Sequence, residues 1–185
     1  ALLRHALSRE CNRPPQDWCF CRGPRGRPGL AETDCTGDKG LCFNLTHTPG
    51  LVACVVTRGG ECGIDAEAVR PRVNPLGIAR RMFAPDEAKE LESLEGEALL
   101  RAFYRGWTLR EAYVKARGTG LAFPTRRLGF EFRDDRLHAH IDSGLDEHAR
   151  AWDFHLLEPT PRHLLALALR PARPVRMERF RFTGN

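Results

Sequence analysis

The spacing of apolar and polar positions divides the chain into a strand-rich start, a helical middle and a strand-rich end. A short helix is predicted over Leu2–Arg9 and a strand over Trp18–Arg22. Runs rich in β-branched and aromatic residues, separated by Pro-Gly and Gly-Gly breaks, predict further strands at Leu41–Leu45, Leu51–Thr57 and Cys62–Ala66. Their close succession along the chain predicts an antiparallel meander.

Helical periodicity dominates the middle of the chain. It predicts a short helix over Asn74–Met82 and another that begins at Pro85, with acidic residues in its first turn. The longest helix covers Leu99–Arg117 and ends at Gly118-Thr119-Gly120. Strands are predicted again at Leu128–Phe132, Arg136–Ile141, Trp152–Leu157 and Leu164–Leu169. This order predicts an α+β chain of two similar α/β halves, residues 1–66 and 67–185, with a pseudo-twofold relation between them.

The composition narrows the class of protein. The chain has 185 residues, of which 42% are hydrophobic and 29% charged, enough for one globular domain or two small halves. No apolar run approaches the ~18 residues that a membrane helix needs, so no membrane partner is expected. The numbering opens at Ala1, without a Met and inside a predicted helix, which predicts that upstream residues are missing from it.

Arginine carries most of the positive charge. Lys and Arg together number 29 against 24 Asp and Glu, a formal net charge of +5, and only three of the 29 are lysines. Arginine binds phosphate and carboxylate through two parallel bonds, so this excess favours a nucleotide, a nucleic acid or an acidic protein as partner. A solvated basic surface explains the same excess.

All seven cysteines precede residue 63. Their number is odd and no pair has C-x-x-C spacing, which argues against a disulfide framework and against a zinc site. Several lie within apolar, strand-like runs. Free thiols in a reducing cytoplasm are therefore predicted.

Two carboxylates share one face of a predicted strand. In Gly63-Ile64-Asp65-Ala66-Glu67, residues two apart point the same way, so Asp65 and Glu67 project together. Neighbouring carboxylates repel one another unless a cation lies between them, and oxygen ligands of this kind suit Mg²⁺. A solvated strand end is the ordinary alternative.

The longest helix offers a third carboxylate. One of its faces combines apolar and charged side chains at helical spacing: Trp107, Arg110, Glu111, Val114 and Lys115. Glu111 and Lys115 can form an ordinary surface ion pair. The apolar members favour an inward face, where Glu111 would complete a metal site with Asp65 and Glu67, and Lys115 would meet phosphate charge.

A third candidate lies in Phe43-Asn44-Leu45-Thr46-His47, which ends a strand just before Pro49-Gly50. An imidazole at a strand end, beside a hydroxyl and an amide, can donate hydrogen bonds to a phosphate. Capping or a place in the core is the more usual role of such a histidine.

Three segments of the sequence resemble the motifs of a known family and occur in the same order. FNLTHT begins at Phe43, GIDAE begins sixteen residues after His47, and WTLREAYVKARGTGL begins at Trp107. They resemble the F-N-x-S-H, G-[IV]-D-x-E and W-x-x-K-E-A-x-x-K-x-x-G-x-G motifs of the Sfp-type 4′-phosphopantetheinyl transferases. RGRP, before the first motif, resembles the G-K-P loop of that family. The similarity runs from about Leu2 to Leu121.

The resemblance implies a fold, a reaction and a set of site residues. The reaction transfers the phosphopantetheine arm of coenzyme A to a serine of an apo acyl or peptidyl carrier protein and releases 3′,5′-ADP. The implied Mg²⁺ ligands are Asp65, Glu67 and Glu111. The implied coenzyme A contacts are Arg4 near the 3′-phosphate, Arg27 at the adenine end, Thr46 and His47 at phosphate oxygens, and Lys115 at the pyrophosphate. The resemblance also implies a monomer.

Some alternatives stay open at the level of sequence. The base that activates the serine hydroxyl is either Glu111, directly or through a bound water, or Lys115. An Arg-rich nucleic-acid-binding module is a non-enzymatic alternative, although three carboxylates would repel a phosphate backbone and no recognised motif is present. Another Mg²⁺-dependent phosphotransferase could use the same acids. We expect no nucleic-acid partner.

Overall fold

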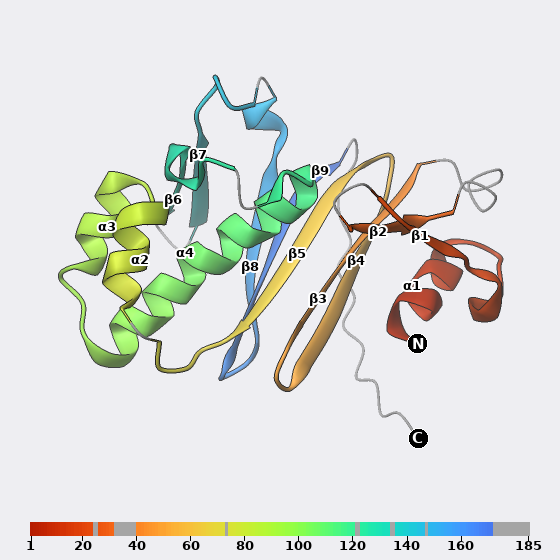
Figure 1. Cartoon of the computed structure of the whole chain (residues 1–185), viewed down its shortest axis with the longest axis horizontal. Helices are drawn as coiled ribbons and strands as arrows, with labels where there is room; N and C mark the ends of the chain where they lie inside the picture. The colour runs from red at the N-terminus through yellow and green to blue at the C-terminus, as the bar shows by residue number, and fades with distance from the viewer. Residues whose placement is uncertain are drawn as a thin grey trace.

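The computed structural model describes residues 1–23, 26–31, 40–72, 74–120, 123–133, 136–146 and 148–171. Its helices and strands are, in chain order, α1 (Leu2–Glu10), η1 (Pro15–Asp17), β1 (Phe20–Arg22), β2 (Pro28–Leu30), β3 (Leu41–Thr48), β4 (Leu51–Arg58), β5 (Gly60–Ala68), α2 (Pro75–Met82), α3 (Pro85–Leu91), α4 (Gly96–Arg117), η4 (Thr125–Arg127), β6 (Leu128–Arg133), β7 (Arg136–Ile141), η5 (Ala149–Ala151), β8 (Asp153–Thr160) and β9 (His163–Pro171). The predicted α+β class is confirmed (Figure 1).

The central strands belong to two separate sheets. β3 and β4 form an antiparallel hairpin, whereas β5 pairs with β9 in a three-stranded sheet of order β5-β9-β8. The predicted meander is therefore wrong at β5. Both faces of β5 are covered, one by the β3–β4 hairpin and the other by α4, and the apolar strand β9 is the matching partner for such a buried strand.

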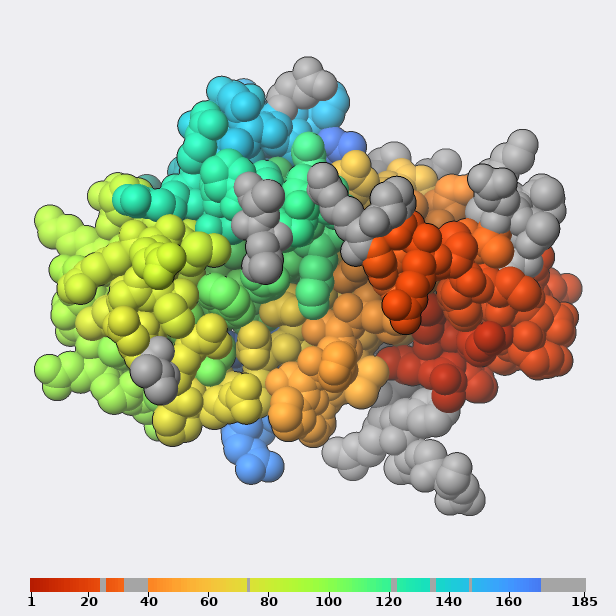
Figure 2. Space-filling model, in the orientation of Figure 1, coloured from red at the N-terminus to blue at the C-terminus, as the bar shows by residue number. Residues whose placement is uncertain are grey.

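The remaining elements lie at the two ends of the molecule. α1 and the β1–β2 pair pack on one face of β3 around Leu7, Trp18 and Phe43. At the other end, α2 and α3 pack against the start of α4 (Figure 1). In the space-filling view, the red N-terminal segment and the yellow-green helices occupy opposite ends (Figure 2).

A close approach of α4 to β5 organises the centre. A Cβ atom added at Gly63 would lie 2.0 Å from the carbonyl oxygen of Ala112 and 2.5 Å from the backbone nitrogen of Ala116. Only glycine allows this approach, so the GID segment brings the strand directly beneath the helix. α4 ends at Gly118, whose left-handed φ of 63° suits a residue without a side chain.

Most predicted boundaries hold within a few residues. The helix predicted over Asn74–Met82 is α2, with the Asn74 side chain accepting the N–H of Gly77 as N-cap. The short strand β2 was not predicted, because its sequence Pro28-Gly29-Leu30 looks like part of a loop. The thiol predicted at Cys35 lies outside the described residues, and the division into two symmetric halves stays a prediction. Within the described ranges, no helix is long and apolar enough to span a membrane.

Candidate active site

The centre of the candidate site is an ion pair between α4 and β5. The Lys115 Nζ atom lies 2.6 Å from Asp65 Oδ1 and also donates to the carbonyl oxygen of Ile64 at 3.3 Å. Thr46 of β3 joins this pair, since its hydroxyl lies 3.4 Å from both Lys115 Nζ and Asp65 Oδ1. Asp65 and Thr46 are buried, at 6% and 5% exposure. Each of the three sequence motifs therefore contributes one residue to this cluster: Thr46, Asp65 and Lys115.

The second strand carboxylate is held by a tryptophan. The indole Nε1–H of Trp107 donates to Glu67 Oε1 at 3.1 Å. Arg72, on the segment that follows β5, makes a cation–π contact with the same indole. Its guanidinium carbon lies 4.9 Å from the centroid of the Trp107 ring. Trp107 is thus more than a core residue, the role that its position in the apolar stripe predicts.

Glu111 lies on α4 between these two contacts. Trp107, Glu111 and Lys115 follow one another at intervals of four residues, so they share one face of the helix. The first of them contacts Glu67 and the last contacts Asp65. The helix face therefore lies against the acidic strand face at Trp107 and Lys115. The role of Glu111 as a third ligand stays a prediction.

Burial raises the pKa of all three acids. For Asp65 the nearby ammonium of Lys115 opposes this effect. The charge of Asp65 adds to the rise in the pKa of Glu67, while the hydrogen bond from Trp107 opposes it. For Glu111 the charges of Asp65 and Glu67 both add to the rise. Carboxyl groups that raise one another's pKa in a partly buried site are a common feature of cation and catalytic sites.

The acids fit a divalent cation in their chemistry but are not arranged around one. In the described part of the chain, no group of three or more His, Cys, Asp or Glu side chains has a geometry that could hold a metal ion. Lys115 provides the positive charge beside Asp65 instead. Asp65 Oδ2, however, is buried without a hydrogen-bond partner. An unpartnered carboxylate oxygen, with two further acids close enough to interact electrostatically, offers the oxygen ligands that Mg²⁺ prefers.

Arg27, a predicted coenzyme A contact, bonds to the protein backbone at the edge of the site. The guanidinium of Arg27 donates to the carbonyl oxygens of Lys115, Ala116 and Cys62 at 2.7, 2.8 and 3.1 Å, so it caps the C-terminal end of α4.

Arg4 likewise makes structural contacts. Its Nη1 atom donates to three backbone carbonyls between residues 15 and 18, and its guanidinium lies over the ring of Phe20. His47 is exposed, and as the neighbour of Thr46 on a strand it points to the opposite face. The structure therefore brings Thr46, Asp65 and Lys115 together through their side chains, and Arg27 contacts the backbone of Lys115. Arg4 contacts the segment around residues 15–18 instead, and His47 points away from the pair.

Two further residues change the sequence interpretation of the site. Arg110, expected on the inward face with Glu111, is buried at 2% exposure, but it is ion-paired with Glu87 and also donates to the carbonyl oxygens of Gly106 and Leu128. Asn44 was not proposed as a site residue, yet its side-chain oxygen accepts the N–H of Ile64, next to Asp65. Its alternation with Thr46 and Thr48 on one strand face is the signal in the sequence.

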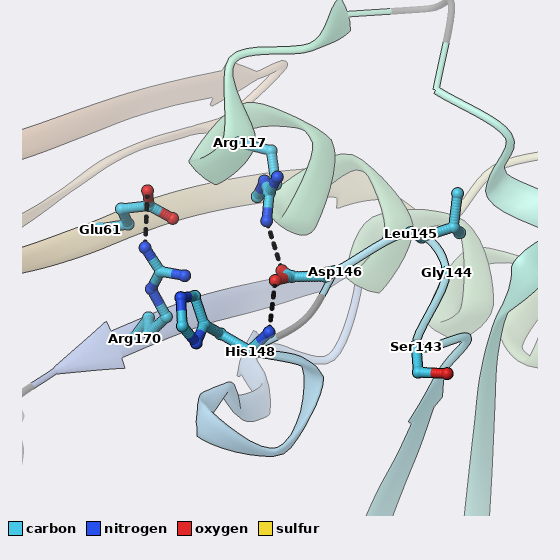
Figure 3. A pocket seen from close by; sticks show the side chains of 8 residues that line it. All are labelled: Glu61, Arg117, Ser143, Gly144, Leu145, Asp146, His148 and Arg170. Carbon is cyan, nitrogen blue, oxygen red and sulfur yellow. Dashed lines mark hydrogen bonds and ion pairs between the residues drawn. The ribbon is translucent and has the colours of Figure 1, made fainter.

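A separate cavity of about 590 Å³ opens beside the C-terminal end of α4. In Figure 3, Asp146 accepts hydrogen bonds from Arg117 and from the backbone of His148, and Arg170 pairs with Glu61. None of the eight predicted site residues lines this cavity. Tyr113 and Trp152 also donate to Asp146, so this carboxylate fixes the side of α4 that faces away from Asp65.

Comparisons with family models and with curated proteins point to the same family. The model of the 4′-phosphopantetheinyl transferase superfamily matches residues 61–168, more than half of the chain. The 4′-phosphopantetheinyl transferase HetI of Nostoc sp. is 38% identical over 121 residues, which cover 65% of this chain and 50% of that protein. The 4′-phosphopantetheinyl transferase AcpT of Escherichia coli is 35% identical over 118 residues, which cover 64% of this chain and 54% of that protein.

Among solved structures, the holo-[acyl-carrier-protein] synthase of Thermotoga maritima is 24% identical with a TM-score of 0.47, covering 61% of this chain and 64% of that one. The chain spans about half the length of the curated relatives it matches.

Proposed function

Since this chain belongs to the 4′-phosphopantetheinyl transferase superfamily, we propose that it transfers the 4′-phosphopantetheine arm of coenzyme A to a serine of an apo acyl or peptidyl carrier protein, releasing 3′,5′-ADP. The observation that carries the proposal is the contact between Lys115 and Asp65, with Glu67 and Glu111 on the same two facing surfaces. Three acids and one lysine at the junction of a helix and a strand suit a diphosphate and its counter-ion.

Asp65, Glu67 and Glu111 would hold Mg²⁺. When bound, the ion supplies Lewis-acid stabilisation and a template for the pyrophosphate of coenzyme A. The unpartnered Oδ2 atom of Asp65 and the raised pKa values of Glu67 and Glu111 support this assignment.

Lys115 and Glu111 would have different roles in the reaction because they differ in charge. Lys115, which already donates to Asp65, would neutralise the charge that develops on the departing 3′,5′-ADP. An ammonium that donates hydrogen bonds cannot accept a proton, so Glu111 is the better base for the serine hydroxyl. Glu111 would take the proton directly or through a bound water.

Incubation of the chain with coenzyme A, Mg²⁺ and an apo carrier protein tests the proposal. The mass of one phosphopantetheine arm should appear on the carrier. Asp65→Asn should abolish the gain, whereas Asp142→Asn, which alters an exposed acid paired with Arg127, should leave it unchanged. A carrier of unchanged mass with the wild-type chain would refute the function.

The proposal extends to the surroundings of the enzyme. We place it in the cytoplasm as a monomer that binds coenzyme A and a carrier protein, without nucleic acid. Cys21, Cys42, Cys54 and Cys62 are free thiols, which supports a reducing compartment. Sedimentation of the purified chain tests the oligomeric state.

A further inference from the structure

The strands β3 and β5 lie side by side but are not joined by a backbone ladder (Figure 1). β3 pairs through its backbone with β4, and β5 pairs with β9. Side chains of β3 bridge the junction instead, at three alternate positions. The backbone N–H groups of Ile64, Ala66 and Ala68 donate to Asn44 Oδ1 at 3.1 Å, Thr46 Oγ1 at 3.1 Å and Thr48 Oγ1 at 3.2 Å. We call these three bonds the side-chain seam.

The seam is a consequence of strand geometry. Residues two apart on a strand share a face, so Asn44, Thr46 and Thr48 all point towards β5. Each carries a short side chain that ends in an oxygen acceptor. Asn44 is 7% exposed and Thr46 is 5% exposed, so two of the bonds are shielded from water. A buried N–H that loses its acceptor costs about 1–3 kcal/mol.

Two bonds of the seam flank Asp65. The peptide N–H before it is held by Asn44 and the one after it by Thr46. The carbonyl of Ile64, in the same segment, accepts from Lys115. The seam therefore fixes the backbone on both sides of Asp65 relative to β3. A shift of one residue would turn Asp65 into the apolar cluster around Ile64 and Ala66.

We propose that Asn44 is a positioning residue for the metal site: by holding the peptide before Asp65, it keeps that carboxylate aimed at α4. This inference rests on the proposed function, in which Asp65 is a ligand of Mg²⁺. Asn44 is the informative position because its bond goes to the backbone of β5, whereas Thr46 also lies beside Lys115 and Asp65.

The test is the dissociation constant of Mg²⁺, measured by titration calorimetry on the full chain without coenzyme A. Asn44→Leu keeps the volume but removes the acceptor, and it should weaken Mg²⁺ binding at least about tenfold, as loss of an outer partner of a ligand commonly does. Asn44→Thr supplies the same kind of oxygen as its neighbours in the seam and should restore binding to within about threefold of wild type.

Thr48→Val is the matched control, because it removes the seam bond to Ala68, which does not flank Asp65. It should lower thermal stability while changing Mg²⁺ affinity less than about threefold, well below the loss expected next to a ligand. If Asn44→Leu does not fold, Asn44→Ala, which leaves room for a water at the Ile64 N–H, should still weaken binding.

Wild-type affinity in the folded Asn44 variant, or equal losses from Asn44→Leu and Thr48→Val, would overturn the inference and leave the proposed function intact. A wild-type chain that does not bind Mg²⁺ but still modifies the carrier would overturn the inference alone, and one that does neither would overturn both.

Discussion

At the scale of single residues, the site is a balance between three acids and one lysine. Asp65 is buried and paired with Lys115, and Glu67 is held by the indole of Trp107. Without a divalent cation, this cluster carries more negative than positive charge. Burial raises the pKa values of all three acids, and the charges of neighbouring acids add to the rise for Glu67 and Glu111. The cost of keeping the acids ionised makes the metal-free site a source of instability.

We expect Glu111→Gln to raise the melting temperature of the metal-free chain at neutral pH. The pKa of Glu111 is higher in the folded chain than its usual 4.5. Ionisation therefore favours the unfolded state, and stability falls as pH rises from the unfolded pKa through the folded one. The advantage of the variant should vanish below about pH 4.5, where the carboxyl is protonated in both states. Thermal unfolding from pH 4 to 8 in EDTA measures it, and a variant less stable than wild type at pH 7 would contradict the direction.

Lys115→Met should lower turnover by roughly 10²–10³-fold, the usual cost of removing a group that stabilises developing charge. The affinity for coenzyme A should fall much less, because the lysine is proposed to act chiefly as the pyrophosphate leaves. Steady-state kinetics together with equilibrium binding of coenzyme A separate the two effects.

Arg117→Met is the control for Lys115→Met. It lies two residues along the same helix but pairs with Asp146 on the opposite side. It should reduce stability while leaving turnover near wild type. A loss in Lys115→Met confined to coenzyme A affinity would instead make that lysine a binding residue.

At the scale of elements, the contact between α4 and β5 depends on Gly63. This residue has helix backbone directly above it, and neither Ala112 nor Ala116 can move without displacing the helix. The same helix is held from behind by Asp146, through Tyr113 and Arg117. The acids of β5 and the face of α4 are therefore fixed with respect to one another from both sides.

Gly63→Ala should destabilise the chain by about 1–3 kcal/mol or more, because its Cβ would overlap the backbone of α4. Mg²⁺ binding should weaken with it, since the helix carries Glu111. Gly129→Ala is a suitable control, because its Cβ would meet other atoms only at 3.7 Å or beyond. Chemical denaturation of both variants gives the comparison, and equal stability of the two would disprove the steric argument.

The elements themselves were accessible from the sequence because local patterns determine them. Asn74, Pro85 and Gly118 mark helix ends by capping chemistry that acts within a few residues. The partner of β5 was not accessible in this way. Pairing with β9 joins segments about a hundred residues apart, and the adjacent hairpin offered a simpler but wrong solution.

The same distinction holds for the site. Periodicity alone placed Asp65 with Glu67, and Glu111 with Lys115, each on one face, and contacts to Asp65 and Glu67 confirm that the two faces meet. Periodicity could not separate Arg110 from that face, because the direction of a long side chain depends on its partner, here Glu87. Nor could a motif reveal that Arg27 reaches the end of α4, because this contact is set by the path of a loop.

At the scale of the whole molecule, charge is the property that concerns a partner. The chain has a formal net charge of +5, carried almost entirely by arginine. A basic surface accelerates encounter with an acidic partner, and salt screens this effect over about 10 Å at 0.1 M.

Transfer to an acidic carrier protein should therefore slow as salt rises, chiefly through kcat/KM for the carrier. The rate of transfer from 25 to 500 mM NaCl, roughly a fourfold decrease in screening length, measures this dependence. Substitution of a carrier with fewer acidic residues serves as the control and should flatten the curve. A rate independent of salt with the acidic carrier would exclude electrostatic steering.

The side-chain seam also has a consequence for protein engineering. A hairpin in this place must supply three oxygen acceptors in alternate positions and apolar side chains against Ile64 and Ala66. The β3–β4 hairpin could then be exchanged for one from a distant homologue that presents Asn, Ser or Thr at those three positions and keeps the apolar ones. We therefore expect recombination between family members to be tolerated at the edge of the candidate site.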